Sequence, residues 1–346
     1  MSEHEAFAGL VELAAAGLGG RVIGASDDFF AGAASLLLPE PARFEPGRFT
    51  ERGKWMDGWE SRRKRGEGHD YCVIALGAPG HVRGFDIDTS HFIGNHPPFA
   101  AVDGLAAPSS STLDELLRLS WRPLLPEVPL APGRHNYFAA EASDVVSHVR
   151  LRIFPDGGVA RLRVFGRVEP QLFPGARDER DEHTQREVPA GLVDLAALAR
   201  GGRALACSDA RFGGMSHLIM PGRAVNMGGG WETRRGRPPD HERDWLILEL
   251  ASRGRARVVE VDTAYFIGNF PESCAVEGVD WPAATATELF RSARWEPILA
   301  RSKLSADSRH FFRGSDVSGR PVTHVRLTIF PDGGVSRFRL WGEPLV

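Results

Sequence analysis

The segment His148–Gly166, HVRLRIFPDGGVARLRVFG, decides the fold of this chain because it returns as His324–Gly342, HVRLTIFPDGGVSRFRLWG. A recurrence this close indicates two copies of one unit. In each copy apolar residues alternate with polar ones up to Pro-Asp-Gly-Gly, which is typical of a strand followed by a turn. The pattern predicts an antiparallel β-hairpin with one apolar and one basic face, suited to a sandwich.

The length and composition fit two globular domains. The chain has 346 residues, so that each half, of roughly 170 residues, is long enough to bury a core of its own. Its hydrophobic content of 42% and charged content of 25% are those of an ordinary globular protein. The formal net charge of -3 offers no general attraction to nucleic acid, and we expect no such partner.

The cysteines and the N-terminus bear on the compartment. Cys72, Cys207 and Cys274 are the three cysteines, and their wide spacing fits neither a zinc motif nor a disulfide framework. The N-terminus begins acidic and lacks the basic and apolar regions of a signal peptide, and no apolar run is long enough to span a bilayer. We therefore expect a cytoplasmic protein that does not associate with membranes.

The repeat extends over most of the chain. Gly9–Gly20 and Gly191–Gly202 are similar segments, each with a short helical pattern that ends in Gly-Gly. GWESRR at Gly58–Arg63 returns as GWETRR at Gly230–Arg235, after a loop that is ten residues shorter in the second copy. Further expected elements also come in pairs: strands at 71–76 and 245–250, and short helices at 113–119 and 286–292.

These elements predict the fold class and the domains. Many short strands between Gly and Pro turns, with no strand–helix alternation, predict an all-β protein of two tandem jelly-roll β-sandwich domains with a few short helices. The charged, proline-containing stretch Glu169–Pro189 is the predicted linker, with a boundary near residue 180. Residues 1–180 then hold the first repeat with the linker, and residues 181–346 hold the second. Repeated sandwich faces also favour a homo-oligomer.

The segment around Trp59 and Glu60 is the most informative motif. Arg62 and Arg63 follow within three residues, and a guanidinium group holds a carboxylate through two parallel hydrogen bonds. The motif predicts a site for a small anionic substrate. The structural alternative is a solvated turn in which Glu60 neutralises the arginines while Trp59 covers the end of the sandwich.

Two further segments supply titratable groups. Asp27 and Asp28 follow a strand, where they can hold a divalent ion, place a general base, or simply cap a turn. Asp88, His91 and Asn95 can supply acid, base or hydrogen-bonding groups, although a structural interpretation gives Asn95 the left-handed position of a turn. The sequence contains no HExxH, CxxC or spaced acidic loop that would indicate a tight metal site. A divalent metal is therefore possible, but no sequence motif predicts one.

The second copy repeats part of this set. Its equivalents are Asp209, Trp231, Glu232, Arg234, Arg235, Asp262 and Asn269. Ala210 replaces Asp28 and Tyr265 replaces His91. The first copy therefore has the richer set of titratable groups, and the sequence leaves open whether one or both copies hold an active site.

Taken together, the motifs resemble the allantoicase family over essentially the whole chain. The matching segments are SDDFF (26–30), GKWMDGWESRRKR (53–65), GHDYC (68–72), DIDTSHFIGN (86–95), CSDARFG (207–213) and GRAVNMGGGWETRR (222–235). The resemblance implies jelly-roll domains of galactose-binding-like type. It also implies hydrolysis of allantoate, a small-molecule substrate, to ureidoglycolate and urea.

Such a reaction requires an anion clamp, an acid for the leaving urea nitrogen and a base for water. We assign the clamp to Arg62 and Arg63, the base to Asp27 or Asp28, and the acid to His69 or His91. The residues expected to complete the binding site are Trp59, Glu60, Asp88 and Asn95. The competing hypothesis is a non-catalytic pair of lectin-like domains that bind a sugar or a small acidic ligand.

Overall fold

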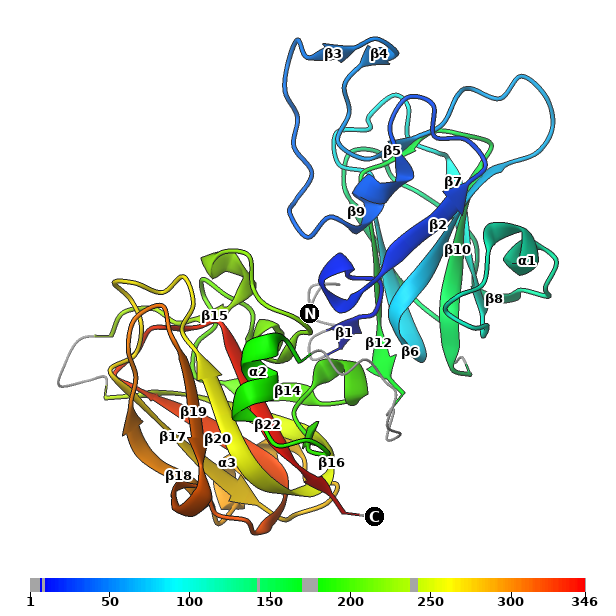
Figure 1. Ribbon diagram of the computed structural model, residues 1–346. Coiled ribbons are helices and arrows are strands. Elements are labelled where there is room, and N and C mark those ends of the chain that lie inside the picture. Colours follow the sequence, from blue (N-terminus) through cyan, green and yellow to red (C-terminus); the bar gives the residue numbers. More distant parts are fainter. Residues whose placement is uncertain (1–6, 8–9, 142–143, 170–179, 237–241, 346) are drawn as a thin grey trace. The chain divides into compact units, whose positions relative to one another are not determined.

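The computed structural model describes residues 7, 10–141, 144–169, 180–236 and 242–345 (Figure 1). The chain divides into two compact units, Met1–Glu169 and Pro170–Val346. Residues 170–179, which form much of the expected linker and end at the expected boundary, lie outside the described residues. The last part of that stretch contains helix α2 (Glu182–Glu187), whose N-cap is Asp181.

Unit 1 is a two-layered β-sandwich built on one long strand. Its strands are β1 (Val11–Glu12), β2 (Arg21–Ala25), β6 (Asp70–Asp88), β7 (Phe99–Leu105), β8 (Arg122–Pro129), β9 (His135–Ala139), β10 (Val146–Phe154) and β12 (Arg161–Val168). The first half of the 19-residue strand β6 pairs with β2 and β10, and its second half pairs with β9 and β12. β7 and β8 extend the first layer and β1 extends the second. β6 therefore takes part in both layers.

The predicted hairpin at 148–166 is wrong, although its strands are right. β10 pairs with β6 and β7, whereas β12 pairs with β6 and β1, so the two arms lie in different layers. The connection between them carries β11 (Gly158–Val159), which pairs with β5 (Trp59–Glu60). Val149, Leu151 and Ile153 are fully buried, as the alternation predicts. Alternation cannot distinguish a hairpin from a crossing between layers, because both layers present their apolar faces to one core.

Unit 2 repeats this architecture (Figure 1). Its strands are β13 (Val193–Asp194), β14 (Arg203–Cys207), β15 (Trp231–Glu232), β16 (Asp244–Asp262), β17 (Ser273–Val279), β18 (Glu296–Lys303), β19 (Arg309–Arg313), β20 (Pro321–Phe330), β21 (Gly334–Val335) and β22 (Arg337–Pro344). The strand order β13-β22-β16-β20-β17-β18 matches β1-β12-β6-β10-β7-β8. The predicted fold class, two tandem jelly-roll sandwiches with a few short helices, is confirmed.

The two expected pairs of helices have different outcomes. Helices α1 (Leu113–Leu117) and α3 (Ala286–Ser292) form as predicted, and each begins with a capping box. The segments 9–20 and 191–202 hold only the 3₁₀ turns η2 (Ala16–Leu18) and η4 (Leu198–Arg200) after the short strands β1 and β13. A helix is wrong there because the backbone of these strands pairs with β12 and β22. Gly19 and Gly201 end the turns with φ of 103° and 106°.

The loop that is longer in the first copy lies between η3 (Ala33–Leu37) and β5. It contains the short strands β3 (Phe49–Thr50) and β4 (Gly53–Lys54), which pair with each other and project from unit 1 in Figure 1. The shorter segment of unit 2 holds the 3₁₀ turns η5 (Met215–Ile219) and η6 (Met227–Gly229), and η7 (Gly314–Asp316) lies after β19. Among the described residues, no helix is long and apolar enough to cross a membrane.

The basic residues of the repeated segment form internal contacts, and one of them, Arg161, holds this loop in place. Arg161 is buried, and its guanidinium group donates to the carboxylate of Asp57 at 2.8 Å and to the backbone carbonyl of Glu40 at 3.0 Å. On the other layer, Arg150 and Arg152 both donate to Asp103. These side chains are committed to ion pairs within unit 1 and offer little charge to a polyanion.

Candidate active site

Asp27 and Arg62 form the centre of the candidate site in unit 1. The carboxylate of Asp27 accepts hydrogen bonds from Arg62 Nε at 2.7 Å, from the Arg62 backbone N–H at 3.0 Å and from the Phe29 backbone N–H at 3.1 Å. Burial acts to raise the pKa of Asp27, but these hydrogen bonds and the guanidinium charge outweigh it and lower the pKa below its ordinary value. Asp27 is therefore a firmly ionised partner of Arg62.

The buried side chain of Trp59 helps to fix the position of this pair. Its side chain is fully buried, and its indole N–H donates to the backbone carbonyl of Asp27 at 2.8 Å. The strand pairing of β5 with β11 fixes Trp59 beside the crossing between the layers. The predicted tryptophan thus belongs to the core and fixes the position of the Asp27 backbone.

Unit 2 repeats the same corner. Arg234 donates to Asp209 through Nε at 2.8 Å and through its backbone N–H at 2.9 Å, and Trp231 donates to the Asp209 carbonyl at 2.8 Å. The pKa of Asp209 is lowered for the same reasons: hydrogen bonds outweigh the effect of burial. The aspartate–arginine pair is therefore part of the repeated scaffold.

Glu60 and Asn95 form a second pair in unit 1. The Asn95 amide donates to Glu60 Oε1 at 2.7 Å, while the Asn95 backbone carbonyl accepts the Gly158 N–H at 2.8 Å. Burial raises the pKa of Glu60, although the hydrogen bond from Asn95 opposes the rise. Glu232 and Asn269 repeat the side-chain contact at 2.6 Å. Unlike Asp27, Glu60 is a carboxylate whose affinity for a proton is increased.

The exposed side chains of Asp28 and Arg63 complete this corner. Asp28 follows Asp27 and Arg63 follows Arg62, so both lie next to the central pair in the chain. In the described part of the chain, no hydrogen bond or ion pair uses either side chain. Both groups are therefore available to a ligand.

The two predicted histidines lie on different segments. His69 packs against the ring of Phe154, with ring centres 4.9 Å apart, and burial together with the charges of Arg152 and Arg150 lowers its pKa. His91 Nε2 lies 3.1 Å from the carbonyl oxygen of Ala42, in the long loop. His91 also holds the left-handed backbone position, with φ of 70°, and the turn interpretation that gave this position to Asn95 is wrong. Among the described residues, neither histidine is hydrogen-bonded to Asp27 or Asp28.

Asp88 lies on the outer face of the second layer. It is buried, and its carboxylate accepts the Ser90 backbone N–H at 2.8 Å. Two residues earlier, Asp86 pairs with His135 Nδ1 at 2.8 Å, and His135 Nε2 lies 3.9 Å from Asp88. His135 was not among the predicted site residues. It begins the strand HNYFA, and its ring lies on the same face of the sheet as Asp86 and Asp88. In unit 2, Asp262 binds Arg223 at 2.8 Å.

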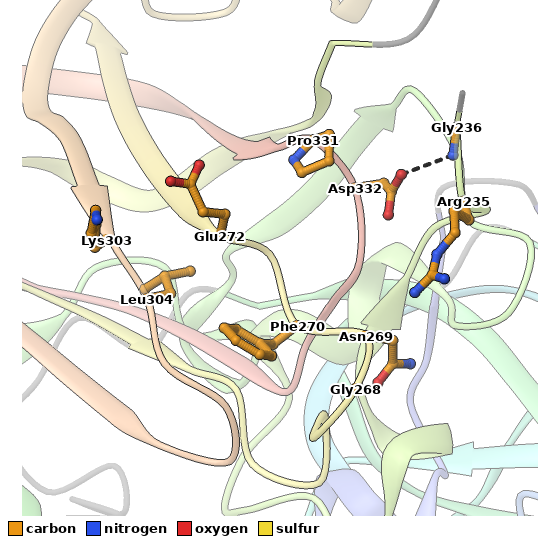
Figure 2. A pocket seen from close by; sticks show the side chains of 10 residues that line it. All are labelled: Arg235, Gly236, Gly268, Asn269, Phe270, Glu272, Lys303, Leu304, Pro331 and Asp332. Carbon is orange, nitrogen blue, oxygen red and sulfur yellow. Dashed lines mark hydrogen bonds between the residues drawn. The ribbon is translucent and has the colours of Figure 1, made fainter. Parts of the chain in front are cut away.

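Unit 2 contains a pocket of about 520 Å³ (Figure 2). Two of the predicted second-copy residues, Arg235 and Asn269, line it. Asp332, from the repeated Pro-Asp-Gly-Gly turn, lines it as well, and its carboxylate accepts the Gly236 backbone N–H at 2.8 Å. Sequence reasoning assigned that turn a purely structural role. Its equivalent contact in unit 1 joins the Lys64 backbone N–H to Asp156 at 2.6 Å.

Metal ligation finds little support in these geometries. Within the described residues there is no group of three or more His, Cys, Asp or Glu side chains placed to hold a metal ion. The carboxylates of Asp27 and Glu60 are instead held by arginine, asparagine and backbone N–H groups.

Comparison with known proteins identifies the repeat. Residues 11–169 and 193–345 each match the family model described as the allantoicase repeat. The probable allantoicase of Rhizobium meliloti (strain 1021) is 47% identical over 341 residues, which cover 97% of this chain and 94% of the relative. The probable allantoicase of Pseudomonas paraeruginosa (strain DSM 24068 / PA7) is 45% identical over 344 residues, which cover 99% of this chain and 98% of the relative.

A solved structure agrees with this match. The crystal structure of allantoicase from Saccharomyces cerevisiae superimposes with a TM-score of 0.78 at 32% identity, covering 96% of this chain and 93% of that chain. One copy of the matched repeat lies in each of the two sandwich units. The chain therefore belongs to the allantoicase family.

Proposed function

We propose that the protein is an allantoicase, which hydrolyses allantoate to ureidoglycolate and urea in purine degradation. The observation that carries this proposal is the match of both repeats over nearly the whole chain. In allantoate one carbon bears a carboxylate and two ureido groups. Water supplies a hydroxyl group to that carbon, one C–N bond breaks, and the departing nitrogen takes up a proton, so that one C–O bond replaces one C–N bond.

Arg62 is the proposed clamp for the substrate carboxylate. Its Nε and one terminal nitrogen bind Asp27, which leaves the other terminal nitrogen for the substrate. We assign Asp27 a positioning role, since a carboxylate with a lowered pKa is a poor proton acceptor. Arg63 is exposed beside it and provides a second positive charge for the same anion. Trp59 acts indirectly, by fixing the Asp27 backbone.

Glu60 is the proposed base for the attacking water. Its raised pKa brings its proton affinity closer to that needed at neutral pH, and the hydrogen bond from Asn95 orients one carboxylate oxygen. Asp28 is the alternative base, because its side chain is exposed and makes no hydrogen bond or ion pair with another described residue. The two assignments differ in the second copy, which keeps Glu232 but has Ala210 in place of Asp28.

His91 and His69 remain the proposed acids for the leaving urea nitrogen. His91 is exposed on the turn after β6, whereas burial and the charge of Arg152 lower the pKa of His69 and disfavour its protonated form. We assign Asp88 to the positioning of the turn that carries His91, because its carboxylate caps the Ser90 N–H. Asp262 has the same role in unit 2, where it caps Ala264.

Location and assembly are part of the proposal. We infer a cytoplasmic protein from three cysteines that are all unpaired, as expected in a reducing compartment. We infer no nucleic-acid partner, because basic residues such as Arg150 and Arg326 are bound to Asp103 and Glu277. A homo-oligomer is proposed from the repeated sandwich faces alone.

Urea release from allantoate by the purified protein tests the activity. The assay is run with added divalent cations and after chelation, so that a metal requirement appears as loss of activity in the chelated sample alone. Absence of urea under both conditions would overturn the hydrolase proposal and favour the lectin-like alternative. N-carbamoylglycine is the matched control, because its carbon bears only one nitrogen and offers no aminal bond to break.

A further inference from the structure

We infer that the pocket of unit 2 is a binding site for a small carboxylate that carries a ureido group, held by Arg235 and Asp332. The choice of ureido acid rests on the proposed function, since this chemistry is shared by its substrate and product. The pocket is lined by residues of unit 2, whereas the hydrolysis is assigned to residues of unit 1.

Arg235 supplies an uncommitted positive charge. It is exposed and lines the pocket, and no hydrogen bond or ion pair between described residues uses its guanidinium group. Neighbouring arginines are neutralised: Arg234 binds Asp209 at 2.8 Å and Arg301 binds Glu272 at 2.9 Å. A free guanidinium group can hold a carboxylate through two parallel hydrogen bonds. An anion that enters this pocket therefore meets Arg235 without having to displace a partner from the described residues.

Asp332 and Asn269 supply acceptors next to that charge. Figure 2 places Arg235, Asp332 and Asn269 at one end of the pocket, with the ring of Phe270 between them and Lys303. Asp332 uses Oδ2 to accept the Gly236 N–H, and Asn269 uses its amide nitrogen to bind Glu232. The remaining side-chain oxygen of each residue can accept an N–H group. A ureido group presents such donors in one plane, beside an apolar wall.

At the end of the pocket where Arg235 lies, one cation is accompanied by one carboxylate, and this combination limits the ligand. A phosphate dianion would be attracted by Arg235 but repelled by Asp332, whereas a monoanion with N–H donors satisfies both. A carboxylate without a ureido group would offer no N–H donor to the remaining oxygen of Asp332 or to the amide oxygen of Asn269. The same end of unit 2 has Ala210 where unit 1 has Asp28, and Tyr265 where unit 1 has His91. Unit 2 thus keeps the means to bind a ureido acid, and it lacks the alternative base Asp28 and the proposed acid His91.

The experiment uses N-carbamoylglycine and the full chain. Two equivalent backbone N–H groups report on the two units: Gly236 donates to Asp332 in unit 2, and Lys64 donates to Asp156 in unit 1. We expect the Gly236 amide resonance to shift on titration. Lysine-selective ¹⁵N labelling gives three backbone signals, from Lys54, Lys64 and Lys303, and so makes Lys64 easy to follow. A shift confined to Lys64, or no shift in either unit, would overturn the proposal.

Calorimetry with variants then tests the contacts. Arg235→Lys and Asp332→Asn should each raise the dissociation constant of N-carbamoylglycine about tenfold, because each removes a charge-assisted contact. Lys303→Met, at the other end of the pocket, is the matched control and should change it less than about twofold. Unchanged affinity in Arg235→Lys, or glycine or acetate binding as tightly as N-carbamoylglycine, contradicts the inference. None of these outcomes depends on urea release, so failure of the proposed activity is seen separately.

Discussion

Arg62 binds Asp27 through both its side chain and its backbone: Nε lies 2.7 Å from one carboxylate oxygen, and the backbone N–H lies 3.0 Å from the other. This double contact fixes the direction of the guanidinium group before any substrate arrives. Lysine cannot reproduce it, because an ammonium group is a point charge without the planar fork. We therefore expect Arg62→Lys to lower kcat/KM for allantoate by at least about tenfold, measured as the initial rate of urea release.

Unit 2 provides the matched control for this change. Arg234 makes the same contacts with Asp209, so Arg234→Lys removes the equivalent side-chain hydrogen bond from the other repeat. If the chemistry lies in unit 1, Arg234→Lys should retain most of the activity. Equal losses in the two variants would instead indicate a structural role in both corners.

Glu60 gives a prediction about pH. Burial raises its pKa, so a base at this position is protonated, and inactive, up to a higher pH than a free glutamate. Activity should therefore fall as the pH decreases through this raised pKa, and Glu60→Gln should remove most of the activity at every pH. Asn95→Ala removes the hydrogen bond that stabilises the ionised form, and should move the acidic limb of kcat/KM to higher pH.

Asn269→Ala is the control for that shift, since Asn269 makes the equivalent contact with Glu232 in unit 2. Its profile should match that of the unaltered protein. An acidic limb that stays in place in Asn95→Ala would exclude Glu60 as the group that controls it, and would leave Asp28 as the proposed base.

The sequence predicted the strands of this fold better than their partners. Alternation identified Val149, Leu151 and Ile153 as buried, and the repeat established two units. The sequence pattern did not predict that β10 and β12 lie in different layers. Their placement depends on the long strand β6, whose first half pairs with β10 in one layer and whose second half pairs with β12 in the other. Local pattern carries information about which face is apolar, whereas strand order is decided by contacts distant in the sequence.

The candidate site shows the same division. The motifs predicted that Asp27 and Arg62, which are 35 residues apart in the chain, belong to one site. They did not predict that the two residues form an ion pair, because that contact depends on the pairing of β5 with β11. His135 escaped prediction because it has no motif of its own and meets Asp86 across 49 residues. Asp332 was not predicted as a site residue because it lies in the repeated Pro-Asp-Gly-Gly turn. Aspartate is common in turns for structural reasons, so its presence there does not by itself indicate a function.

Gly157 gives a prediction about stability at the crossing between the layers. Its φ is 143°, and a Cβ atom there would lie 2.7 Å from Pro97 N, part of a backbone that cannot give way easily. Gly157→Ala should lower the free energy of unfolding of unit 1 by about 2 kcal/mol or more, measured by urea denaturation. Gly94→Ala is the control, because a Cβ atom there meets nothing within 4 Å. Similar losses in both variants would contradict a steric origin.

Glu12 makes the stability of unit 1 depend on pH. One of its carboxylate oxygens is buried and has no hydrogen-bond partner among the described residues, and burial raises its pKa from 4.5 to about 7 despite Arg163 nearby. The folded state then keeps a proton that the unfolded state releases, so stability falls as the pH rises from about 4.5 to about 7, by ~3 kcal/mol in total.

Glu12→Gln should abolish this dependence. The neutral amide has the same shape, so the variant should unfold at a higher urea concentration than the unaltered protein at pH 8, with the advantage lost by about pH 4.5. The exposed Glu182→Gln controls for the general effect of removing one negative charge and should leave the pH dependence unchanged. A loss of stability at pH 8 in Glu12→Gln would mean that the ionised carboxylate is stabilised by Arg163 more than it is penalised by burial, and would reverse the sign of the linkage.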